Sequence, residues 1–140
     1  MNSTIANWTA NWTPRLLGVL RVVTGFLFMQ HGLQKWFGYP PSARSSPIEL
    51  LSLPGIAGLL ELGGGFLLLL GLFSRPVAFV LSGLMAFAYF IAQAPQGFWP
   101  IVNRGELAAL YCFVFLFLAS AGGGPWSLDA WLRQRRLTTN

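Results

Sequence analysis

Residues 21–38 read RVVTGFLFMQHGLQKWFG. The stretch is apolar enough to enter a bilayer as a helix, yet it holds Arg21, His31 and Lys35. At about 3.6 residues per turn, these side chains share one side of the helix with Gly25 and Gly32. A charge inside a membrane span costs about 2.5–3.5 kcal/mol on insertion scales, so such residues usually face the interior of a bundle and find partners there. We therefore expect the rest of the chain to supply those partners.

The composition is that of an integral membrane protein. Hydrophobic residues make up 54% of the chain and charged residues only 9%, and the mean hydropathy is +0.57. A soluble domain averages about 25% charged residues. The net charge of +5 is attributed to arginines beside anionic membrane lipid, and no nucleic-acid partner is expected. The single cysteine, Cys112, permits neither an internal disulfide nor a dithiol pair.

Four apolar stretches separated by glycine and proline turns predict an all-α fold, a transmembrane four-helix bundle that forms one domain over residues 1–140. Each stretch is close to the roughly 20 residues that span a bilayer. Short connections, such as the tight turn expected at 74–76, make neighbouring helices antiparallel. The expected spans are residues 16–37, 56–73, 77–94 and 104–121.

Short interfacial helices are expected at both termini. Near the N-terminus, Ile5, Trp8 and Trp12 fall on one face of a helix, as in segments that lie at the headgroup level. Near the C-terminus, residues 127–136 form an amphipathic segment with Ser127 as its N-cap.

The distribution of basic residues predicts the orientation. With four spans, both termini lie on one side of the membrane, together with five arginines: Arg15, Arg75, Arg133, Arg135 and Arg136. Three basic residues lie on the other side: Lys35, Arg44 and Arg104. The bias places both termini in the cytoplasm, with the chain crossing the membrane several times.

Polar side chains gather near the outer ends of the expected spans. Gly58, Gly64 and Gly65 surround Glu61 and allow close helix approach, so Glu61 is expected to face a neighbouring helix. We expect Glu61 and Glu106 to balance Lys35, Arg104 and the structural charge of Arg21. The candidate pocket residues are His31, Lys35, Glu61, Asn103, Arg104 and Glu106.

Two interpretations of these charges stay open: ion pairs that only fix helix register, or a functional pocket between the first, second and fourth spans. No local ligand spacing predicts a metal site, and no catalytic motif identifies a reaction. The aromatic residues of the last span, Tyr111, Phe113, Phe115 and Phe117, are expected to face either the core or lipid.

Four stretches of the chain resemble, in order, signatures of the DoxX family. They are R-x3-G-x2-F-x-Q-H-G-x2-K-x-F-G at 21–38, ELGG and the following Leu68 and Gly71 at 61–71, NRGEL and LY at 103–111, and GPWSLD at 124–129. One departure is Arg104, where many members have a small residue.

The resemblance implies a four-helix inner-membrane protein associated with redox metabolism, linked either to quinones or to thiols and sulfur. With no cysteine pair, a redox role would require a bound quinone or a partner protein. The cofactor is left open, with a quinone as one candidate, and membrane lipids, protein partners or further copies of the chain are the expected partners. The alternatives are a non-catalytic assembly subunit of a larger membrane complex and a small-molecule transporter.

Overall fold

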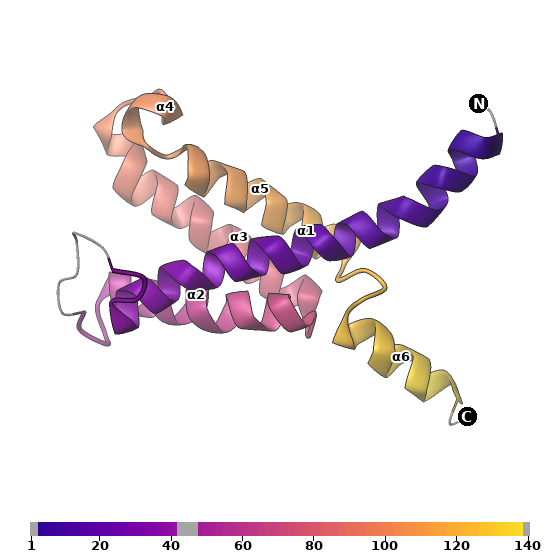
Figure 1. Cartoon of the computed structure of the whole chain (residues 1–140). Helices are drawn as coiled ribbons and strands as arrows, with labels where there is room; N and C mark the ends of the chain where they lie inside the picture. Colours follow the sequence, from indigo (N-terminus) through magenta and orange to yellow (C-terminus); the bar gives the residue numbers. More distant parts are fainter. Residues whose placement is uncertain (1–2, 42–47, 139–140) are drawn as a thin grey trace.

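The computed structural model describes residues 3–41 and 48–138 (Figure 1). The described part of the chain is helical and contains no strand, which confirms the expected all-α membrane fold. In chain order the helices are α1 (Ser3–Phe37), α2 (Leu53–Leu70), α3 (Ser74–Ala88), a π-helical turn (Tyr89–Gln93), a 3-10 turn (Ala94–Gln96), α4 (Pro100–Asn103), α5 (Glu106–Ala121) and α6 (Leu128–Thr138).

Three helical stretches are long and apolar enough to cross a membrane: Ile5–Phe37, Leu53–Leu70 and Ser74–Gln96. The fourth apolar helix, α5, is shorter, and it starts at Glu106 instead of Arg104. Arg104 has a left-handed backbone with φ of 60° where α4 ends, so α5 cannot begin there.

The turn between α2 and α3 lies earlier than expected. Gly71 ends α2 with φ of 71°, a conformation that glycine adopts without steric cost, and α3 already begins at Ser74. The expected turn at 74–76 is therefore wrong, because these residues form the first turn of α3. Pro76 fits there, since a first-turn N–H has no partner within the helix.

The N-terminal residues are helical, but they belong to α1 and form no separate interfacial helix. Helix α1 continues through Pro14, which removes only one hydrogen bond of the helix. In Figure 1 this part of α1 curves away from the other helices. Trp8 and Trp12 are exposed on it, with ring centroids 6.2 Å apart, as expected for residues at the headgroup level.

The C-terminal helix agrees with the expected segment. Helix α6 covers Leu128–Thr138, and the Ser127 hydroxyl accepts a hydrogen bond from Ala130 N at 3.2 Å, which confirms Ser127 as the N-cap.

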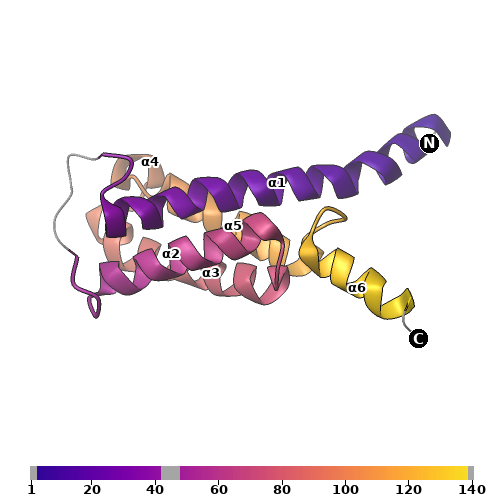
Figure 2. The ribbon, with the colours of Figure 1, turned by 60° about the horizontal axis from the view of Figure 1, so that its bottom comes forward.

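The long helices form two antiparallel pairs, α1 with α2 and α3 with α5. The pairs meet near the α2–α3 turn and diverge from there (Figure 1). We call the end with this turn and the α5–α6 connection the Arg21 end, and the opposite end, where α1 finishes, the Lys35 end. Figure 2 shows the start of α1 and all of α6 toward the Arg21 end.

Glycines let α1 and α2 pack backbone against backbone. A Cβ at Gly32 would lie 2.5 Å from Leu62 N and 2.6 Å from Gly58 O. One at Gly25 would lie 2.9 Å from Gly65 O. Small residues at the interface are a common way for membrane helices to associate, because lipid tails provide no hydrophobic driving force. The expected close approach around Glu61 is confirmed.

The core lies where the two pairs meet, and aromatic rings fill it. Phe28 of α1 is 1% exposed and packs edge-on against Phe115, with centroids 4.8 Å apart. Tyr111 stacks on Phe115 at 5.6 Å. Phe113 and Phe117 point outward and are exposed. The aromatic side chains of α5 thus separate into a core pair and an outward-facing pair.

We predict that Gly32→Ala destabilises the protein by about 1–3 kcal/mol, because the added methyl group would collide with the backbone of α2. Gly63→Ala is the matched control, since a Cβ there meets nothing within 4 Å and alanine favours a helix. Thermal unfolding of both variants in detergent measures the difference. Equal melting temperatures would contradict the glycine-dependent packing of α1 on α2.

Candidate functional site

Arg21 is the most deeply buried cation of the described chain, at 1% exposure. Its Nε donates to Gly123 O at 2.9 Å and its Nη2 to Trp126 O at 2.7 Å. Its Nη1 donates to Leu69 O at 2.8 Å and to Leu68 O. The guanidinium therefore binds the last carbonyl groups of α2 and two carbonyls of the α5–α6 connection.

This arrangement corrects the expectation that Glu61 balances the charge of Arg21. The Arg21 side chain points to the C-terminal end of α2, where free carbonyls carry the negative pole of the helix dipole. Backbone carbonyls accept hydrogen bonds from the guanidinium, and no carboxylate of the described chain forms an ion pair with it.

Asp129, the last residue of the GPWSLD stretch, belongs to the same end. Its carboxylate accepts hydrogen bonds from Phe73 N and Ser74 N, both at 2.8 Å, and so caps α3. Its own N–H donates to Gly71 O at 3.0 Å. Burial raises the pKa of Asp129, but hydrogen bonds from Ser74 and Phe73 and the charge of Arg133 outweigh burial and lower the pKa below its ordinary value. The Asp129 carboxylate is therefore ionised at neutral pH.

At the Lys35 end, Lys35 Nζ and Glu61 Oε1 form an ion pair with a separation of 2.6 Å. The Glu61 side chain is 6% exposed and that of Lys35 is 33% exposed. The pair thus joins α1 to α2 with its carboxylate buried and its ammonium partly open. The expected charge balance between Glu61 and Lys35 and the inward orientation of Glu61 are both confirmed.

Two polar groups beside this pair have no protein partner among the described residues. Glu61 Oε2 and Trp36 Nε1 are buried and form no hydrogen bond. The Trp36 indole covers Gly58, where a Cβ would lie 3.0 Å from Nε1. Gly58 precedes Glu61 by about one helical turn. A buried acceptor and a buried donor without partners mark a place where water or a ligand can bind.

His31 lies between the ion pair and the aromatic core. Its ring meets Tyr111 edge-on, with centroids 6.2 Å apart, and Phe28 at 6.3 Å. His31 is half-buried and sits about one turn before Lys35 on α1. Tyr111 contributes to the surroundings of the candidate site, although the sequence only placed it in the core or toward lipid.

The remaining candidates lie apart from the pair. Asn103 is buried at 1% exposure, and its side chain holds the α4–α5 connection by donating to Gly97 O at 2.7 Å and accepting from Gly105 N at 2.8 Å. Arg104 and Glu106 are exposed. Helix α5 begins on the diverging pair of Figure 1, so the expected convergence of Glu106 on Lys35 and Glu61 is not found.

Among the residues that the structure describes, no three His, Cys, Asp or Glu side chains lie close enough to hold a metal ion. Gln93 Oε1 is a further buried acceptor without a partner, in the π-helical turn after α3. It lies on the other helix pair and is not assigned to the Lys35–Glu61 site.

We predict that Glu61→Gln lowers the free energy of unfolding by about 1–3 kcal/mol, because it removes the charge that pairs with Lys35. Glu106→Gln, at an exposed position, should change it by less than about 0.5 kcal/mol. Thermal unfolding in detergent compares the two variants. If both variants lost a similar amount of unfolding free energy, the Lys35–Glu61 pair would not be a particular source of stability.

Comparison with known proteins agrees with this membrane fold. Over 127 residues the chain is 40% identical to an uncharacterised protein of Haemophilus influenzae, covering 84% of this chain and 91% of the relative. An uncharacterised membrane protein of Mycobacterium tuberculosis is 28% identical over 132 residues, covering 83% of this chain and 80% of the relative. No solved structure matches the chain significantly. The DoxX family model matches residues 16–94, and the chain belongs to the DoxX family.

Proposed function

We propose that this DoxX-family protein is a membrane subunit of redox metabolism that binds a quinone beside the Lys35–Glu61 pair. The observation that carries the proposal is the pair with its buried carboxylate, where Glu61 Oε2 and the indole Nε1 of Trp36, the residue after Lys35, have no partner among the described residues. A role limited to fixing helix register does not require these two unpartnered groups.

The donors around the pair suit a ligand with carbonyl oxygens. Lys35 Nζ has three N–H groups, of which the structure uses one for Glu61, and the side chain is partly open. Lys35 and Trp36 can therefore donate hydrogen bonds to a quinone carbonyl, while Glu61 can hold a proton next to it. A bound quinone would supply two-electron, two-proton chemistry. Because the chain has one cysteine, a thiol- or sulfur-linked role would also depend on a partner protein.

A non-catalytic assembly subunit is the second candidate, and one observation favours it. An apolar groove of about 380 Å³ lies between α2 and α3, lined by residues such as Leu60, Gly63 and Val80. Such a groove suits a helix of another membrane protein or of a second copy of the chain. A small-molecule transporter is the third candidate, although a chain with so small a number of spans would have to dimerise in order to transport.

We predict that the purified protein retains decylubiquinone through gel filtration in detergent and that Lys35→Met reduces this retention by about tenfold or more, as expected for loss of a charged donor. Arg104→Gln is the control, because Arg104 is exposed and distant from the pair. Mass spectrometry of retained small molecules gives the measurement. Equal retention by the wild type and Lys35→Met would contradict the quinone proposal, and co-purification of a protein alone would favour assembly.

We also infer that the chain crosses a bacterial inner membrane with both termini in the cytoplasm. The described Arg21 end carries Arg15, Arg75, Arg133, Arg135 and Arg136. The described Lys35 end carries Lys35 and Arg104, and Arg44 lies outside the described residues. Basic residues concentrate on the cytoplasmic side of membrane proteins.

In a Cys112→Ala background, an impermeant maleimide added to cells should label Gln96→Cys and not Gln134→Cys. Both positions are exposed, one at each end of the bundle. Labelling of Gln134→Cys alone would show that the orientation is the reverse of the one inferred.

A further inference from the structure

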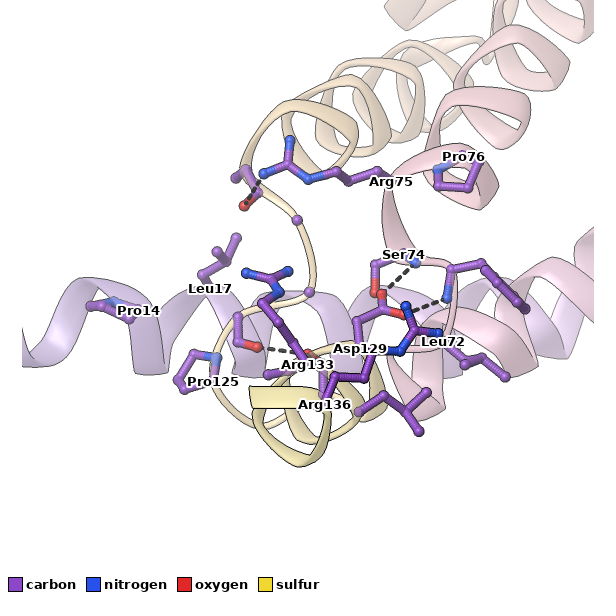
Figure 3. Close-up of a pocket in the computed structure, with 18 residues that line it drawn as sticks. Pro14, Leu17, Leu72, Ser74, Arg75, Pro76, Pro125, Asp129, Arg133 and Arg136 are labelled. Atoms are coloured by element: carbon purple, nitrogen blue, oxygen red, sulfur yellow. Dashed lines mark hydrogen bonds between the residues drawn. The ribbon is translucent and has the colours of Figure 1, made fainter. Parts of the chain in front are cut away.

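A cavity of about 710 Å³ lies at the Arg21 end, away from the Lys35–Glu61 site. It is enclosed by α6, the glycine-rich connection from α5, the start of α3 and the segment of α1 near Leu17. Figure 3 shows residues from these four elements around it. None of the functions proposed above involves this cavity.

The cavity is strongly basic. Arg75, Arg133 and Arg136 line it against a single carboxylate, Asp129, so the lining carries a net charge of +2 (3 − 1). Asp129 already accepts two backbone hydrogen bonds at the start of α3. The cations of the cavity therefore exceed the negative charge that the surrounding protein provides.

The three arginines differ in how they are held. Arg75 donates to Ser120 O and so caps the end of α5. Arg133 and Arg136 are exposed on α6, and in Figure 3 Arg133 extends toward the glycine-rich connection. A guanidinium presents paired N–H donors in a planar fork that matches the oxygens of a phosphate.

The rest of the surroundings is that of a membrane interface. Pro14, Leu17 and Leu132 give the cavity apolar walls. Trp126 and Trp131, on either side of the start of α6, are exposed, and a Cβ added at Gly18 of α1 would lie 3.5 Å from the Trp126 ring. Tryptophans are enriched at the headgroup level of membrane proteins.

We propose that this cavity binds the phosphate of an anionic phospholipid, with Arg133 and Arg136 holding the headgroup and the apolar walls contacting the glycerol and upper acyl chain. The net positive charge favours an anionic headgroup over a zwitterionic one. The apolar walls favour a lipid over free phosphate. Binding would fix α6 against the ends of α3 and α5.

The test titrates the full chain in detergent with dioctanoyl phosphatidylglycerol, with dioctanoyl phosphatidylcholine and with inorganic phosphate, and measures bound lipid by native mass spectrometry and the melting temperature. We expect phosphatidylglycerol to bind about tenfold or more tightly than phosphatidylcholine and to raise the melting temperature. The double variant Arg133→Gln/Arg136→Gln should lose this preference.

Arg135→Gln is the matched control, because Arg135 stacks on Trp131 at 4.0 Å and does not line the cavity. It should keep the preference for phosphatidylglycerol. The proposal is overturned if Arg135→Gln loses as much binding as the double variant, if the two lipids bind equally, or if inorganic phosphate stabilises the protein as well as phosphatidylglycerol does. The substituted residues Arg133, Arg135 and Arg136 are all exposed on α6, so loss of folding does not complicate these variants.

Discussion

The burial of the Arg21 guanidinium is the constraint on which the Arg21 end depends. A fully buried cation is costly unless its donors are satisfied, and here four carbonyl groups accept its hydrogen bonds. Those carbonyls come from the end of α2 and from the connection between α5 and α6. One side chain of α1 therefore ties the end of α2 to the connection between α5 and α6.

Asp129 is the negatively charged counterpart of Arg21 at this turn. Arg21 binds the carbonyl end of α2, and Asp129 binds the N–H end of α3, on either side of the turn at Gly71. Each charge meets the helix pole of opposite sign. The turn also requires small residues, because a Cβ at Gly71 would lie 2.9 Å from Arg21 Cζ and 2.5 Å from Ser127 Cβ. The GPWSLD stretch is thus explained by packing and capping at this turn.

The sequence predicted features that follow from periodicity along one helix. The glycine face of α1, the inward orientation of Glu61 and the helical fold are examples, because helix geometry alone places those residues. It did not predict features that depend on how helices cross. The partners of Arg21 are backbone carbonyls, which no side-chain pattern reveals. The expectation that Glu106 lies close to Lys35 assumed that all four helices run side by side along their whole length. The two helix pairs instead diverge.

The two ends of the bundle differ in whether their charged groups are fully paired. At the Arg21 end, hydrogen bonds to backbone groups satisfy Arg21 and Asp129, and the buried Ser74 hydroxyl is left without a partner among the described residues. At the Lys35 end, Glu61 uses one oxygen for Lys35 and leaves the other unpartnered beside the Trp36 indole. Leaving a buried polar group unpaired costs about 1–3 kcal/mol, so a site that retains two of them is better explained by a small molecule or water than by packing. A ligand that accepts from Trp36 and Lys35 and shares a proton with Glu61 would remove that cost, which supports the ligand site proposed at the Lys35 end.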